Sequence, residues 1–117
     1  MTTKKRAWVY CENITDPRAG VIEGALKSWA IDTHIISSTK GVDGLPVPDF
    51  IVISFPRLPP SYIKRLIQSL PRGDGTRIIV VSESTALSAQ SAENGFAVIR
   101  APNDDAWFAE FRKMLRV

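Results

Sequence analysis

The sequence has little cysteine and no long hydrophobic run, and each shortage excludes a class of protein. Cys11 is the only cysteine among 117 residues, so no disulfide forms within the chain. No apolar run approaches the ~18 uninterrupted residues of a membrane-spanning helix. The basic start at residues 1–6 leads into a short apolar run without a cleavable signal. These features predict a cytoplasmic domain that makes no membrane contact.

The sequence also lacks a basic stripe. It has 15 Lys and Arg against 12 Asp and Glu, a net charge of +3. Six of the basic residues lie at positions 4–6 and 112–116, which leaves nine basic and twelve acidic residues between them. A surface that follows nucleic-acid phosphates needs Lys and Arg gathered along one element, with aromatic residues between them. We therefore expect no nucleic-acid partner.

What the sequence does have is the composition of one soluble globular domain. Hydrophobic residues make up 44% of the chain and charged residues 23%. A chain of this length buries roughly two-thirds of its unfolded surface, which is enough to fold without a metal or a disulfide. We expect residues 1–117 to form a single domain, with residues 1–6 as a basic tail or linker.

Short apolar runs alternate with helical patterns along the chain. Strands are expected at 7–11, 31–36, 49–54, 78–82 and 96–99. Helices are expected at 16–29, 61–70, 85–94 and 104–115. Most of the strands are continuously apolar, as in a parallel sheet covered on both faces, whereas 31–36 alternates in part and predicts one exposed face. The Gly- and Pro-rich stretch 37–48 predicts a loop where a second helix would lie.

This order of elements predicts a doubly wound α/β fold. We expect a five-stranded parallel sheet in the flavodoxin-like order 2-1-3-4-5, with right-handed crossovers. Asp16 and Pro17 are typical of a helix start, because Asp caps free amides and Pro is tolerated in the first turn. The inner face of this helix is expected to hold Val21, Ile22, Ala25, Leu26 and Trp29.

The final helix is also amphipathic. Asn103 or Asp104 is expected to cap it. We expect Phe108, Phe111 and Leu115 to face inward, with Trp107 beside that stripe. Trp107 and Arg112 are then candidates for an interaction surface, although burial in the core is an equal alternative for Trp107.

In such a fold, functional groups gather where the strands end at their carboxyl edge. The residues there are Cys11-Glu12, Ser54, Ser82 and Ala101-Pro102. The whole chain resembles the CheY-like receiver domain of bacterial two-component signalling, and these segments fall where the signature residues of that family belong. The family carries an acidic pair, a phosphoacceptor Asp, a Thr or Ser, and a Lys-Pro at the ends of the first, third, fourth and fifth strands.

The chain departs from that pattern at three places. Cys11 and Glu12 stand at the acidic pair, so at most one carboxylate remains for a magnesium ion. Ser54 stands at the phosphoacceptor, and a hydroxyl without an activating base is a weak nucleophile. Ala101 replaces the Lys that contacts the phosphoryl group, while Ser82 and Pro102 match. We therefore expect no catalytic residue, no metal and no cofactor.

The resemblance then implies a non-phosphorylatable pseudo-receiver that regulates through protein contacts. Its layout, with a loop in place of the second helix, is similar to pseudo-receivers of hybrid sensor histidine kinases of the BarA/GacS type. We expect its partners to be other domains of the same kinase or a signalling protein, with no small-molecule substrate. The domain would then be the cytoplasmic part of a membrane-bound kinase. A stand-alone receiver-like adaptor is the alternative.

An enzyme that uses Cys11 is a further alternative. A cysteine after the first strand of a small α/β domain resembles phosphocysteine carriers and small tyrosine phosphatases. Those sites hold phosphate with Gly-rich backbone amides, whereas Cys11 is followed by Glu12-Asn-Ile-Thr-Asp16, with no glycine and two anions. His34 is a candidate for a phosphorelay histidine, but it lies in a predicted strand and is expected to face solvent.

Overall fold

The computed structural model describes residues 5–11, 15–37, 47–54, 60–69, 75–81, 96–100, 102 and 104–115. Five strands are present: β1 (Arg6–Cys11), β2 (Asp32–Ile36), β3 (Phe50–Ser54), β4 (Arg77–Val81) and β5 (Ala97–Ile99). Three helices lie within the described residues: α1 (Pro17–Ser28), α2 (Pro60–Ser69) and α4 (Asp105–Leu115). The helix predicted at 85–94 and most of the loop predicted at 37–48 fall outside these residues.

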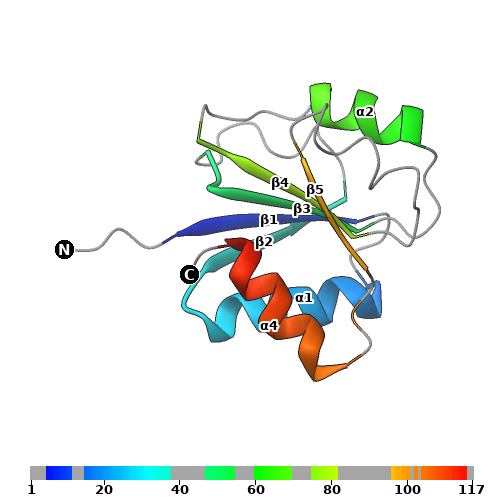
Figure 1. Ribbon diagram of the computed structural model, residues 1–117. Coiled ribbons are helices and arrows are strands. Elements are labelled where there is room, and N and C mark those ends of the chain that lie inside the picture. The colour runs from blue at the N-terminus through cyan, green and yellow to red at the C-terminus, as the bar shows by residue number, and fades with distance from the viewer. Residues whose placement is uncertain are drawn as a thin grey trace.

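The strands form one sheet in the order β2-β1-β3-β4-β5, and every pair is parallel. This confirms the predicted five-stranded doubly wound sheet. Helices α1 and α4 cover one face of the sheet and α2 lies on the other (Figure 1). Within the described residues, no helix is long and apolar enough to cross a membrane.

Burial along the strands follows the predicted pattern. Every residue of β3 is buried, and β1 and β4 are buried except at their first residue. A strand with helices on both faces has no solvent side, so its sequence is apolar throughout. In β2 only Thr33 and Ile36 are buried, and His34 is exposed, so the predictions of one open face and of a solvent-facing His34 are confirmed.

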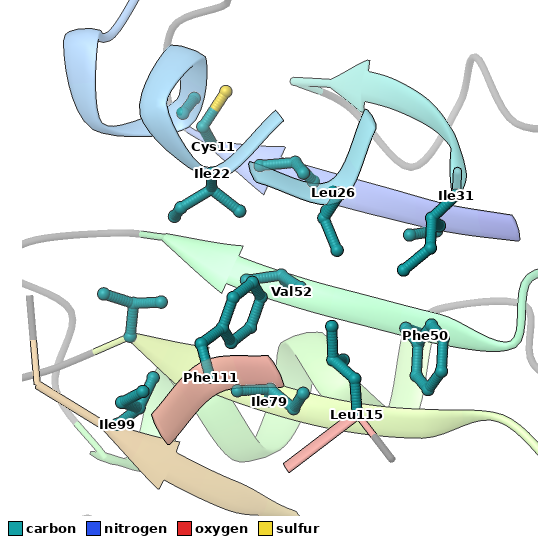
Figure 2. Close-up of a cluster of buried hydrophobic side chains, with 14 of the residues drawn as sticks. Cys11, Ile22, Leu26, Ile31, Phe50, Val52, Ile79, Ile99, Phe111 and Leu115 are labelled. Atoms are coloured by element: carbon teal, nitrogen blue, oxygen red, sulfur yellow. The ribbon is translucent and has the colours of Figure 1, made fainter. Parts of the chain in front are cut away.

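The larger hydrophobic cluster lies between the sheet and the α1/α4 layer. Alternate residues of β1 and β3 point toward Ile22 and Leu26 of α1 and Phe111 and Leu115 of α4 (Figure 2). The stacked rings of Trp107 and Phe111, with centroids 4.7 Å apart, fill the space under α4. A second cluster on the other face joins Trp8, Tyr10, Ile51, Ile53 and Leu66 of α2.

Two details of the predicted helix faces are wrong. Val21 is 43% exposed, because the buried face of α1 is centred on Ala19, Ile22, Ala25 and Leu26. Trp107 is fully buried, whereas Phe108 is only half-buried. The inner stripe of α4 runs through Trp107, Phe111 and Leu115, each four residues apart, so Trp107 belongs to the core and not to an interaction surface.

Side chains and backbone define the helix ends. Asp16 accepts a hydrogen bond from the amide of Arg18 at 2.9 Å, and Asp104 accepts one from the amide of Trp107 at 3.0 Å. Both aspartates therefore cap helices, as predicted. At the end of α1, Ala30 N–H donates to the Lys27 carbonyl and Ile31 N–H to the Leu26 carbonyl, which together form a Schellman motif.

Ala30 gives a first test of this local structure. Its φ of 61° lies in the left-handed region, where a Cβ is strained. Replacing Ala30 with Gly removes that strain at the cost of a more flexible unfolded chain, so we expect a gain of about 0.5–1 kcal/mol in the free energy of unfolding. Guanidinium denaturation at an unchanged m-value measures this gain.

Ala109→Gly is the matched control, because Ala109 is exposed within α4 and has no positive φ. Glycine at such a helical position costs about 0.5–1 kcal/mol. The assignment of Ala30 to a strained helix end is wrong if Ala30→Gly is destabilising by the same amount as the control.

Candidate functional site

The carboxyl ends of the strands line up in register. Cys11 at the end of β1 lies opposite Ser54 at the end of β3, and Ser54 lies opposite Val81 of β4, which in turn faces Ile99 of β5. The sheet therefore brings Cys11 and Ser54 together at one edge. Three further residues singled out from the sequence, Glu12, Ser82 and Ala101, lie outside the described residues.

Cys11 is a buried thiol in an apolar setting. It has no exposed surface, and its Sγ donates to the carbonyl oxygen of Ile36 at 3.8 Å. Strand alternation directs it to the α1 side of the sheet, where it belongs to the same hydrophobic cluster as Ile22 (Figure 2). A reactive cysteine is partly exposed in electropositive surroundings, so this geometry does not support a Cys11 nucleophile.

Ser54 is also buried, with 2% of its surface exposed. It lies in the innermost part of the sheet, with β1 on one side and β4 on the other. A neutral hydroxyl needs an adjacent base to become a nucleophile. The nearest strand-end partners, Cys11 and Val81, supply no such base. Covalent catalysis at Ser54 has no support from these neighbours.

The described strand ends do not fit a magnesium ion. Magnesium takes hard oxygen ligands in a near-octahedral arrangement, whereas this edge presents a buried thiol and a neutral hydroxyl. In the part of the chain that the structure describes, no group of three or more His, Cys, Asp and Glu side chains is placed to hold a metal.

Among the residues that the structure describes, Tyr10, one residue before Cys11, is a titratable group whose pKa is shifted. Burial is the main cause that raises the pKa of the Tyr10 phenol, and the neighbouring Tyr62 and Cys11 raise it further. The ring belongs to the cluster on the α2 face, so it points away from Cys11 across the sheet. Tyr10 therefore stays protonated near neutral pH and is no general base.

The connection from β5 to α4 is held by a network that the sequence did not predict. Arg100 pairs with Asp104 at 3.3 Å and with Glu110 at 3.7 Å. The indole N–H of Trp107 donates to the Arg100 carbonyl oxygen. Since Asp104 also caps α4, one residue joins the strand end to the helix start. This network fixes the backbone at Arg100 and at Asp104, on either side of position 101.

Arg112 is exposed on α4, as an interaction-surface residue must be. Its guanidinium lies over the ring of Trp29, 5.8 Å from the centroid, in cation–π geometry. Trp29 in turn packs at 5.9 Å against Phe111, so the same aromatic group links the ends of α1 and α4. Of the two residues proposed for an interaction surface, only Arg112 is accessible.

Comparison with known proteins rests on structure. No family model matches the chain, and no curated protein matches it in sequence. The pilus assembly protein CpaE from Caulobacter crescentus superposes with a TM-score of 0.71 at 15% identity, covering 94% of this chain and 89% of that one.

Receiver domains superpose over nearly the whole chain. A CheY-like response regulator receiver domain from Methylobacillus flagellatus gives a TM-score of 0.69 at 13% identity, covering 97% of this chain and 99% of that one. The receiver domain of a sensor histidine kinase from Pseudomonas aeruginosa, solved with magnesium in its active-site cleft, gives 0.64 at 19% identity, covering 97% and 96%. The chain thus has the CheY-like receiver fold.

Proposed function

We propose that this protein is a non-phosphorylatable pseudo-receiver that acts as a regulatory, protein-binding module in two-component signalling. The observation that carries the proposal is the pair Cys11 and Ser54, adjacent, buried and uncharged at the strand ends. Receivers hold an acidic residue and the phosphoacceptor Asp at these strand ends. The fold is that of a receiver, while the groups that would perform its chemistry are different.

Phosphotransfer by the receiver mechanism needs a carboxylate nucleophile, a metal ion and a cation for the phosphoryl oxygens. Ser54 stands in place of the carboxylate nucleophile, and Cys11 removes one ligand of the metal ion. Ala101 stands in place of the cation. Because all three groups act on one reaction, their joint replacement removes the reaction rather than slowing it. The domain is therefore non-enzymatic, and regulation proceeds by contact.

The proposed setting is a hybrid sensor histidine kinase, with the module among the kinase's cytoplasmic domains. The similarity to a receiver domain of a sensor histidine kinase supports this setting. A stand-alone adaptor is the second candidate. The superposition on a pilus assembly protein, with a TM-score of 0.71 against 0.64 for the kinase receiver domain, favours it, because the same fold occurs there outside kinases. The coding sequence before residue 1 and after residue 117 distinguishes the two.

A phosphoryl analogue tests the proposal directly. Beryllofluoride with magnesium mimics an acyl phosphate on a receiver aspartate, and it needs both the carboxylate and the metal. We expect the amide spectrum of the ¹⁵N-labelled domain to stay unchanged on addition of both, since Cys11 and Ser54 offer neither group.

A receiver domain that carries the acidic pair and the phosphoacceptor Asp serves as the positive control and should show large shifts. Specific shifts clustered at Cys11, Ser54 and Val81 of the present domain would contradict the proposal. Shifts with magnesium alone would indicate a metal site, and the proposed loss of metal binding would then be wrong.

A further inference from the structure

A cavity lies at the edge of the sheet where the strands begin, opposite the edge that holds Cys11 and Ser54. It has a volume of about 250 Å³ and is lined by Lys5, Asp49, Phe50, Gly75, Arg77 and Leu115. The start of β1 and the end of α4 lie on this side of the molecule (Figure 1). Gly75 is exposed, and a Cβ there would meet no atom within 4 Å, so this part of the rim leaves room for a ligand to enter.

The floor of the cavity is apolar. Phe50 of β3 and Leu115 of α4 lie side by side in the cluster between the sheet and the α1/α4 layer (Figure 2). Both side chains are buried, so they form a fixed surface at the bottom of the cavity. Small-molecule sites combine such an apolar surface with a few polar groups that fix the orientation of the ligand.

Three charged side chains surround this floor. Lys5 and Arg77 carry positive charges and are exposed, whereas Asp49 carries a negative charge and is half-buried. Within the described residues none of the three forms an ion pair, although they line one cavity. Their charges are therefore available to a ligand that carries both signs.

Two of these charged residues are held in place by hydrogen bonds. Asp49 Oδ2 accepts from the amide of Arg6 at 2.9 Å, and the backbone of Asp49 bonds to Arg6 on one side and Arg77 on the other. The guanidinium of Arg77 donates to the carbonyl of Met114 at 3.3 Å, which uses one of its five N–H donors. Little conformational entropy is lost when side chains that are already held bind a ligand.

We propose that this cavity binds a free α-amino acid with an aliphatic side chain. Lys5 and Arg77 bind its carboxylate, and Asp49 accepts hydrogen bonds from its ammonium group. The aliphatic side chain packs on Phe50 and Leu115. A simple anion would be repelled by Asp49 and a simple cation by Lys5 and Arg77. The volume equals roughly eight water molecules of liquid, which suits a ligand of about nine non-hydrogen atoms such as leucine.

This site goes beyond the proposed function and does not rest on it, because it uses neither Cys11 nor Ser54. The expected affinity is low, with a dissociation constant of about 1 mM, since two of the three charged groups are exposed to solvent. Added salt should weaken binding further because it screens exposed charges.

Titration of L-leucine into the ¹⁵N-labelled 117-residue chain tests the proposal. We expect saturable shifts of the amide signals of Asp49, Phe50 and Gly75. Two analogues separate the contributions, because 4-methylpentanoate lacks the ammonium group and 3-methylbutylamine lacks the carboxylate. Each should bind at least about tenfold more weakly than L-leucine, since each loses hydrogen bonds to a charged group.

Two variants test the assigned side chains. Lys5→Gln should weaken binding of L-leucine about fivefold, as expected for an exposed ion pair. Asp49→Asn should weaken it about tenfold and should strengthen binding of 4-methylpentanoate, because the repulsion of the carboxylate is removed. Asparagine keeps an oxygen that accepts the Arg6 amide, so the start of β3 is preserved. Arg18→Gln is the matched control, because Arg18 is exposed on α1, does not line the cavity and should leave the dissociation constant unchanged.

The inference is overturned if L-leucine gives no saturable shifts up to its solubility limit, or if the shifts cluster away from the cavity. It is equally wrong if both analogues bind as tightly as L-leucine, because recognition would then not need both charges. Thermal unfolding establishes that each variant is folded. A folded Asp49→Asn variant that binds L-leucine like the unchanged chain would remove Asp49 from the site and contradict the proposed ligand class.

Discussion

Replacing Cys11 with Asp, the residue type that receivers carry there, is expected to destabilise the domain by about 3 kcal/mol or more at neutral pH. The side chain has no exposed surface and lies in the cluster between β1 and α1. The neighbouring Ile36 carbonyl accepts a hydrogen bond from the thiol, and an ionised carboxylate has no proton to donate to it. A carboxylate buried in this apolar cluster is costly, so it favours its neutral form.

The pH dependence of this variant follows from the same burial. Desolvation raises the pKa of the introduced carboxyl in the folded state above its unfolded value of about 3.9. The protonated form donates to the Ile36 carbonyl, so the loss of stability should be small below about pH 4 and grow as the pH rises. Guanidinium denaturation at several pH values measures it.

Cys11→Ala is the control, since it keeps the position apolar and is expected to cost only about 1 kcal/mol at every pH. If Cys11→Asp is as stable as the unchanged chain, or if magnesium stabilises it, the strand end is open to solvent. The proposal that this domain has lost receiver chemistry would then fail.

Replacing Trp107 with Ala is expected to cost about 3–5 kcal/mol of the free energy of unfolding. The indole stacks on Phe111 with centroids 4.7 Å apart and meets Phe108 edge-on at 5.2 Å. Its N–H also donates to the Arg100 carbonyl, so the substitution leaves a cavity and removes this hydrogen bond. Denaturant unfolding monitored by far-ultraviolet circular dichroism gives the value.

Trp107→Phe separates the two contributions. It keeps a ring beside Phe111 but removes the donor to Arg100, so we expect a smaller loss of about 1–3 kcal/mol. Equal losses for Ala and Phe would mean that the hydrogen bond, and not packing, accounts for the effect. A loss below about 1 kcal/mol for Trp107→Ala would contradict the burial of this side chain.

The strands and their order could be predicted because a parallel sheet leaves few alternatives. Phe50–Ser54 has no polar residue before its end, and such a run fits a strand that is covered on both faces. The helix starts could be predicted from Asp16 and Asp104, whose side chains act locally on the next amides. Helix caps, which act locally, and continuously apolar strands could therefore be predicted from the sequence.

The orientation of α4 could not be predicted in the same way. Trp107, Phe108 and Phe111 offer two apolar stripes that differ by about 100°, and helical periodicity does not choose between them. Contacts from outside the helix contribute to the choice, such as the Arg100 carbonyl that accepts the indole N–H. A hydrogen-bond partner contributed by another element leaves no signal in the helix sequence itself.

The position of the candidate site could be predicted from the sequence, but the burial of its side chains could not. Parallel strands end at a common edge, which is why Cys11 and Ser54 were expected together. Cys11 points toward α1 because tertiary packing decides which alternate residues of β1 face that helix. When a strand is apolar on both faces, its sequence does not indicate which residues face which side of the sheet.

The position of β1 between β2 and β3 has a consequence for how the chain folds. Arg6 N–H donates to the Asp49 carboxylate at 2.9 Å across a separation of 43 residues, and β3 begins beside it. During synthesis the first strand therefore emerges long before its inner neighbour, and only β2 can pair with it in the interval. Closing such a loop lowers the chain entropy before stabilising contacts form, so folding should be slower than in a helical bundle of equal length. A nascent chain that ends before β3 leaves one edge of β1 open to pairing with other chains.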